Sequence, residues 1–168
     1  MRESALMANP ITMEKAYSRF GLFLGLFPTM AIFIQVLGDI SFLEGSLIFP
    51  LLFLAAIAGT SVAGYLTGGV AARAVRNALK RRLSVSLSLL PLIGFVWGAV
   101  SGALGGLFLF GIGAVFGGIL GAVIGTVAVP VFALTHNLLR KGDFIEQKHF
   151  LPLALGNAIT VSALLLGL

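Results

Sequence analysis

Five apolar runs without charged residues constrain this chain more than any other feature of its sequence. They fall at about residues 21–38, 47–69, 86–107, 111–135 and 151–168. Each run has about 18 to 25 residues, which lets a helix cross a hydrocarbon core about 30 Å thick. Because no water reaches that core, a spanning segment must satisfy its backbone polar groups internally, as a helix does. The sequence therefore predicts an all-α fold, a polytopic integral membrane helical bundle with five transmembrane helices.

The composition agrees with lipid as the solvent of a single domain. Hydrophobic residues make up 58% of the 168 residues and charged residues only 10%, whereas average soluble domains carry about 25% charged residues. We expect one membrane domain over residues 1–168. The run at 151–168 is the weakest, since it makes a helix only about 27 Å long and has no aromatic or basic anchor at its end. Four spans plus a re-entrant or interfacial C-terminal segment are the alternative.

The positions of the cations predict the orientation. All 11 Lys and Arg residues lie before the first run, between the second and third, or between the fourth and fifth. The other two connections hold only Asp39 and Glu44, or no charge. With a cytoplasmic N-terminus, every cation is on the inner side, as the positive-inside rule requires. This explains the net charge of +5 without nucleic acid, and with the absence of cysteine it fits a bacterial inner membrane.

A basic stripe follows the second run. Residues 70–84 keep a helical apolar pattern with cations beside it. Clusters of this kind attract anionic headgroups, at about 1 kcal/mol per basic residue near the surface. We therefore expect anionic lipid headgroups at the cytoplasmic face, the alternative being that the cations only set the orientation. The candidate residues are Arg73, Arg76, Lys80, Arg81 and Arg82.

Two sets of glycines at a spacing of four occupy the third and fourth runs. They are Gly94, Gly98, Gly102 and Gly106, then Gly113, Gly117, Gly121 and Gly125. Glycine is about 1 kcal/mol worse than alanine in a helix, but small residues let helix backbones approach in lipid. The two sets mirror each other about a turn between Leu109 and Phe110. We predict a close-packed glycine-zipper hairpin of spans three and four, crossing at about −40°, with a zipper between chains as the alternative.

Polar residues within the runs are few and neutral. Because the runs hold no Asp, Glu, Lys or Arg, charge-coupled transport and intramembrane hydrolysis are disfavoured. Thr60, Ser61, Thr126 and Asn157 fall at a similar depth in the predicted orientation. They are candidates for an intramembrane polar cluster, either as structural hydrogen bonds of about 0.6 kcal/mol each or as a site for a neutral solute.

No catalytic pattern stands out. Glu146 and His149 have a spacing that can supply two metal ligands, but the spans offer no further carboxylate. The glycine-rich segment lacks the Gly-Lys-Ser/Thr ending of a phosphate loop. We expect no catalytic residue, metal or cofactor. An enzyme that acts at the cytoplasmic face through His136 and His149 is the least favoured hypothesis.

Small residues also recur on other spans, at Gly21, Gly25, Ala56, Thr60, Gly64, Gly68, Gly156 and Thr160. These faces favour a non-enzymatic membrane protein that acts through helix–helix association, as a homo-oligomer or as an accessory subunit of a membrane complex. The alternative function is a passive channel or carrier for a neutral or lipid-like solute. It would use neutral polar groups and the helix kinks expected at Pro28 and Pro130.

Overall fold

The structure, a computed structural model, describes residues 9–39, 48–140 and 144–167. Within them the chain forms five helices and one two-stranded sheet. Each helix is long and apolar enough to cross a membrane. The expectation of an all-helical bundle with five such helices is therefore confirmed, and it is compatible with an integral membrane protein. The elements in chain order are β1 (Pro10–Thr12), α1 (Met13–Asp39), α2 (Ile48–Leu79), α3 (Leu83–Gly106), α4 (Ile112–Leu139), β2 (Phe144–Glu146) and α5 (Gln147–Leu166).

The helices are longer than the apolar runs that predicted them. α1 begins at Met13 and so includes Lys15 and Arg19, and α2 continues through the basic stripe to Leu79. Lys and Arg are good helix formers, so a charge marks the edge of the apolar run and not the end of the helix. α2 ends where the Ser86 hydroxyl donates a hydrogen bond to the carbonyl of Ala78, at 2.7 Å. That bond satisfies one of the carbonyls that a helix end leaves unpaired.

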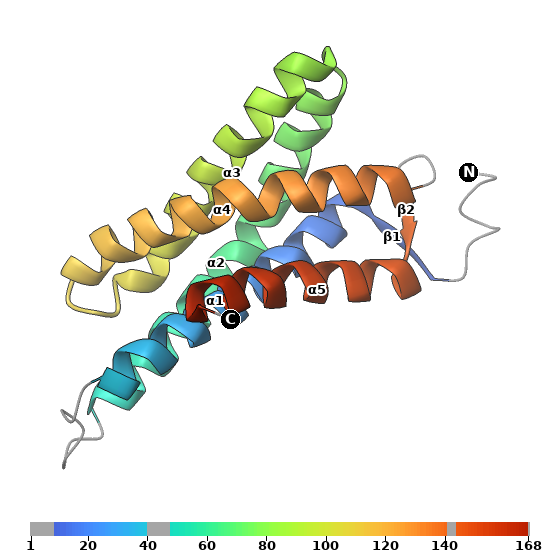
Figure 1. Ribbon diagram of the computed structural model, residues 1–168. Coiled ribbons are helices and arrows are strands. Elements are labelled where there is room, and N and C mark those ends of the chain that lie inside the picture. Colours follow the sequence, from blue (N-terminus) through green and yellow to red (C-terminus); the bar gives the residue numbers. More distant parts are fainter. Residues whose placement is uncertain (1–8, 40–47, 141–143, 168) are drawn as a thin grey trace.

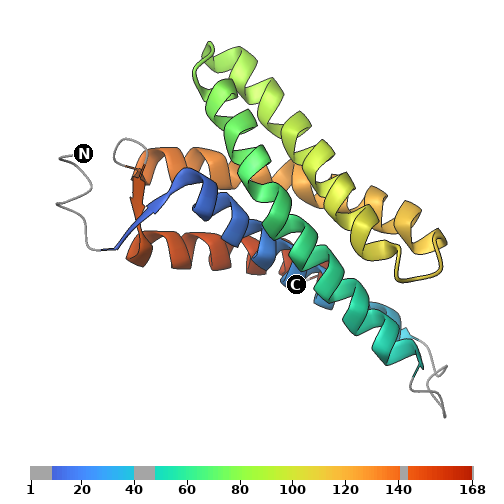
Figure 2. The same ribbon diagram turned by 180° about the vertical axis from the view of Figure 1, so that it is seen from behind.

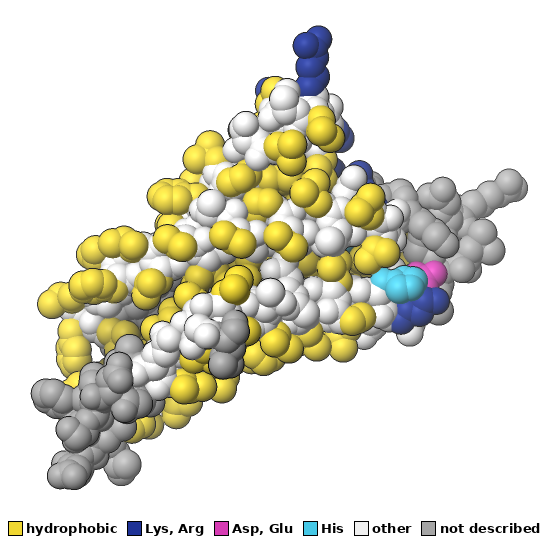
Figure 3. All heavy atoms as spheres, viewed as in Figure 1, with side chains coloured by type: hydrophobic (Ala, Val, Ile, Leu, Met, Phe, Trp, Pro, Cys, Tyr) yellow, Lys and Arg dark blue, Asp and Glu magenta, His cyan; other side chains and the backbone are white. Residues whose placement is uncertain are grey.

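The helices form two antiparallel hairpins, α1/α2 and α3/α4, with α5 beside α1 and α4 (Figure 1). Seen from behind, α2 of the first hairpin packs against α3 of the second (Figure 2). We call the end with the α2–α3 and α4–α5 connections the basic end, and the end with the α3–α4 turn at residues 107–111 the neutral end. The Lys and Arg side chains visible in Figure 3 lie at the top and at the right, near the two connections of the basic end, and many apolar side chains are exposed between them and the neutral end.

A short β-ladder closes the basic end. β1 pairs antiparallel with β2, with Ile11 opposite Ile145 and Thr12 opposite Phe144. Both isoleucines are buried, at 5% and 0% exposure. The ladder fastens the start of α1 to the start of α5. It was not predicted from the sequence, because three residues per strand are too few to show an alternating pattern.

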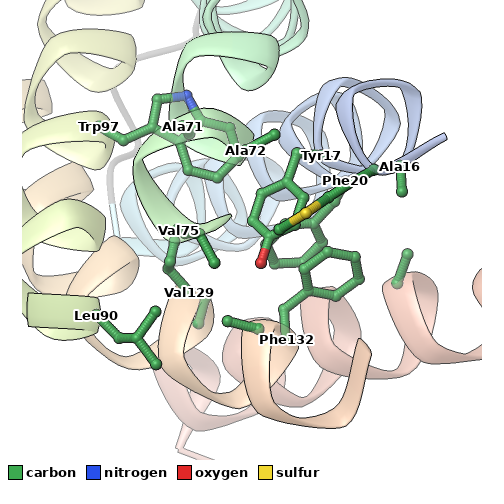
Figure 4. Packing of buried hydrophobic residues seen from close by; sticks show 14 of the residues in the cluster. Ala16, Tyr17, Phe20, Ala71, Ala72, Val75, Leu90, Trp97, Val129 and Phe132 are labelled. Carbon is green, nitrogen blue, oxygen red and sulfur yellow. The ribbon is translucent and has the colours of Figure 1, made fainter. Parts of the chain in front are cut away.

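Aromatic side chains fill the space between α1 and α4 in the basic half of the bundle. We call Tyr17, Phe20, Trp97, Phe132 and Phe150 the aromatic wedge. Figure 4 labels the first four of these residues. The rings of Phe20 and Phe132 stack with their centroids 3.9 Å apart, and Tyr17 meets Phe132 edge-on at 5.1 Å. Rings of this size hold α1 and α4 apart. Towards the neutral end the two helices diverge, at the left of Figure 1.

The β-ladder can be tested by disulfide formation, because the chain has no cysteine of its own. Thr12→Cys combined with Phe144→Cys places two thiols on facing residues, whose Cα atoms lie about 4.5–5.5 Å apart in an antiparallel pair. That separation suits a disulfide, so oxidation should join the two segments, as read by mass spectrometry of proteolytic fragments. Thr12→Cys with Glu146→Cys is the control, since diagonal neighbours are about 7–8 Å apart. Equal yields would contradict the register.

Candidate functional site

The glycines of α3 lie against the glycines of α4 along one continuous contact, which we call the α3/α4 seam. A Cβ atom added to Gly94, Gly98, Gly102 or Gly106 would overlap the backbone of a glycine on α4. The glycines met in this order are Gly125, Gly121, Gly117 and Gly113. All eight predicted packing glycines therefore face one another across the contact between two helices of the same chain. The crossing angle of about −40° stays a prediction.

A second contact of the same kind joins α1 to α2. A Cβ on Gly21 would overlap the backbone of Gly64, and the reverse also holds. A Cβ on Gly25 would lie 2.6 Å from the Cα of Ser61, which is closer than real Cβ contacts. We call this contact the α1/α2 seam. Each hairpin is thus held by backbone approach that no larger side chain would permit.

Between the two seams lies an apolar groove of about 350 Å³, formed by residues of α1, α2, α3 and α4. Glycines of both seams line it, among them Gly25, Gly64 and Gly102. Trp97, from the aromatic wedge, lines it as well and is only 7% exposed. The groove is partly open and not an enclosed cavity, and Phe116, one of its lining residues in the neutral half, is 64% exposed. It is therefore a recess that opens outwards in the neutral half of the bundle.

The groove offers little hydrogen bonding and no charge. Among the described residues that line it, three carry hydroxyls and none is charged. The Thr60 hydroxyl donates to the carbonyl of Ala56 at 2.8 Å, and the Ser101 hydroxyl donates to the carbonyl of Trp97 at 2.9 Å. The indole N–H of Trp97 donates to the hydroxyl of Thr67 at 2.8 Å. Apart from the Thr29 hydroxyl, these donors are already used inside the protein, so the groove suits a guest that needs few hydrogen bonds.

The four residues of the predicted polar cluster do not hydrogen-bond to one another in the described part of the chain. Thr60, Ser61 and Thr126 each donate to the carbonyl four residues earlier in their own helix. Asn157 is the one that reaches another helix, donating from Nδ2 to the carbonyl of Ala128 at 3.0 Å. Serine and threonine in helices satisfy themselves in this local way. The depth of a hydroxyl therefore did not predict its partner.

The basic stripe divides into paired and exposed cations. Arg76 on α2 forms an ion pair with Glu14 on α1, with 2.7 Å between Nη2 and Oε1. The other four lie exposed at the basic end: Arg73, Lys80, Arg81 and Arg82. Headgroup contact stays a prediction for these four. Arg76 has a structural role, because its ion pair with Glu14 joins the two helices of the first hairpin.

Two buried side chains carry polar atoms at the aromatic wedge, one belonging to the wedge and the other beside it. Tyr17 and His136 are 0% and 1% exposed, with ring centroids 5.9 Å apart. Neither the Tyr17 hydroxyl nor either ring nitrogen of His136 has a hydrogen-bond partner among the described residues. His149 lies 3.9 Å from Glu146, and Asp143 is outside the described residues. Within the described part, no group of three His, Cys, Asp or Glu could hold a metal ion.

No family model, curated protein or solved structure matches this chain. The functional argument therefore rests on the groove and the two seams. The groove had no signal in the sequence, because the residues that open it come from different runs. Phe20 and Phe132 are 112 residues apart in the sequence, so only the structure shows that their rings stack between α1 and α4.

Neighbouring glycines on α4 provide a matched test of the α3/α4 seam. Gly117→Ala should lower the thermal unfolding temperature in detergent, because the new Cβ would meet the backbone of Gly102 and overpacking costs about 1–3 kcal/mol. Gly118→Ala should keep or raise it, because its Cβ would lie 3.5 Å from that of Ala103, an ordinary contact, and alanine favours the helix by about 1 kcal/mol. The same unfolding temperature for both variants would contradict the seam.

Proposed function

We propose that this chain is a non-enzymatic integral membrane protein that holds a neutral, lipid-like solute in the groove between its hairpins. The apolar groove carries this proposal. Its volume of about 350 Å³ lies within the range of about 300–1,000 Å³ typical of small-molecule sites. Its lining has no charge within the described residues, and its Thr60 and Ser101 hydroxyls are already bonded within their own helices. A solute without charge fits these surroundings.

The two seams support this solute-holding role over association as the main function. The small-residue faces that favoured association between chains are turned inwards on α1, α2, α3 and α4. We propose that the α3/α4 seam acts as a glycine zipper that keeps its hairpin a single unit in lipid. The groove then has two stiff walls. Because the aromatic wedge fills the space beyond Trp97, the groove favours a bound solute over a channel running to the basic end.

We propose that the basic end and the N-terminus face the cytoplasm, with the chain in a bacterial inner membrane. The Lys and Arg side chains visible in Figure 3 lie near the two connections of the basic end, as the positive-inside rule requires of a cytoplasmic face. The exposed cations Arg73, Lys80, Arg81 and Arg82 would contact anionic lipid headgroups there. The groove would then lie in the outer half of the bilayer.

Native mass spectrometry tests whether the groove holds a guest. Protein taken from vesicles of phosphatidylethanolamine and phosphatidylglycerol into mild detergent should keep one lipid-sized adduct. Ser101→Phe should remove the adduct, because residue 101 lines the groove and the new ring would fill it. Ser88→Phe is the matched control on the same helix, since Ser88 also donates to the carbonyl four residues earlier but lies exposed.

Retention of the adduct by Ser101→Phe at the level of Ser88→Phe would contradict the proposal. Thr29→Phe, from the α1 wall of the groove, is the second blocking variant. Circular dichroism of each variant shows whether the helices are intact. A folded Thr29→Phe protein that keeps the adduct would contradict the proposal in the same way.

Association remains the second candidate function, and a specific face of α5 favours it. A Cβ added to Gly156 would meet no atom within 4 Å, and Thr160, one turn later, is exposed. A pair of small residues four apart is a common contact face between membrane helices. This face could receive a second copy of the chain or a helix of another membrane subunit.

Oligomeric state in detergent tests this second candidate. Gly156→Leu should shift the protein towards the monomer in analytical ultracentrifugation, because a leucine keeps two helix backbones apart. Gly69→Leu is the control, since a Cβ at Gly69 on α2 also meets nothing within 4 Å but lies on a different helix. A wild-type protein that is monomeric and has no co-purifying partner would exclude association.

A further inference from the structure

The dimensions of the groove limit what it can hold. Its α1 wall runs from Gly21 to Phe33, which is about 18 Å of helix. Its volume of about 350 Å³ is near the lower end of the range of about 300–1,000 Å³ for small-molecule sites. An extended, unbranched hydrocarbon chain is an apolar guest of this length and size.

The two ends of the groove differ. At one end is Trp97, whose ring lies 6.2 Å from that of Phe20, centroid to centroid, and so belongs to the aromatic wedge. At the other end Phe33 of α1 and Phe53 of α2 lie beside each other, with centroids 4.1 Å apart. The closed end is near the middle of the bundle, because Trp97 is the fifteenth of the 24 residues of α3. The groove thus runs from mid-depth to the neutral end.

This direction matches the way that a lipid lies in one leaflet. Lipid headgroups lie at the membrane surface and chain ends meet at the midplane, so a lipid of the leaflet at the neutral end already points its chains towards Trp97. Of the three hydroxyls that line the groove, those of Thr60 and Ser101 already donate to carbonyls of their own helix, and Thr29 carries the third. One hydroxyl does not replace the water around a lipid headgroup, so the polar part of the guest stays outside the groove.

We propose that the groove binds one hydrocarbon chain of a lipid from the leaflet at the neutral end. The chain end lies against Trp97 and the headgroup stays at the membrane surface. This inference rests on the proposed function and names its guest. A hydrocarbon chain that enters the groove exchanges apolar lipid for an apolar lining, so it gains little from the hydrophobic effect. Van der Waals contact with the groove walls holds it instead.

Trp97 makes the guest visible, because it is the only tryptophan of the chain. The protein is reconstituted into phosphatidylcholine vesicles in which a rising fraction of the lipid carries bromine on its acyl chains. Bromine quenches tryptophan fluorescence on contact, and bulk lipid is kept from Trp97, which is only 7% exposed. Lipid brominated near the chain end should quench Trp97 strongly, and lipid brominated near the headgroup should quench it weakly.

Ser101→Phe should cause loss of the quenching by chain-end bromine, and the exposed control Ser88→Phe should keep it. Stronger or equal quenching by bromine near the headgroup would overturn the chain direction, and the proposed function would stand if the adduct persists in mass spectrometry. An adduct without quenching by either lipid would show a guest other than a lipid chain. Neither quenching nor an adduct would overturn both proposals together.

Discussion

Direct contact between helix backbones is the interaction on which the rest of this structure depends. Helices in a bilayer gain little from the hydrophobic effect, since lipid is as apolar as their side chains, and close packing must hold them together. Both hairpins meet this need with glycine, at Gly98 and Gly121 in one and at Gly21 and Gly64 in the other. The cost is about 1 kcal/mol per glycine in helix propensity. In the α3/α4 seam this loss of helix propensity occurs at eight positions.

The groove follows from combining two such seams with one cluster of large rings. Each seam fixes the two helices of its hairpin so closely that neither hairpin can spread to fill the space beside it. In the basic half, Phe20 and Phe132 fill that space with a stacked pair of rings. In the neutral half the facing residues include Gly25 and Gly102, which leave it open. The change from stacked rings to glycines near the middle of the bundle therefore opens the groove.

What the sequence could predict depended on how local each signal was. Helix number and approximate bounds followed from runs of 18 or more apolar residues, because the thickness of the bilayer is the same for every span. The glycine spacing indicated which residues lie opposite each other, because the turn at Leu109 and Phe110 fixes the register of both helices. The groove could not be predicted, because the sequence does not show that Phe20 and Phe132 stack between α1 and α4. The hydrogen-bond partners of the hydroxyls could not be predicted either, because Thr60 and Ser61 donate to carbonyls of their own helix.

The β-ladder joins the earliest described part of the chain to one of the last, more than 130 residues apart. During synthesis Ile11 emerges first, while Ile145 follows only after four of the helices have been made. Contacts between such distant segments form late, because a long loop must close before they can form. Each hairpin, by contrast, joins consecutive helices and can assemble as soon as its second helix is complete. We therefore expect biogenesis of this fold to end with the insertion of α5 and the closing of the ladder, after both hairpins have formed.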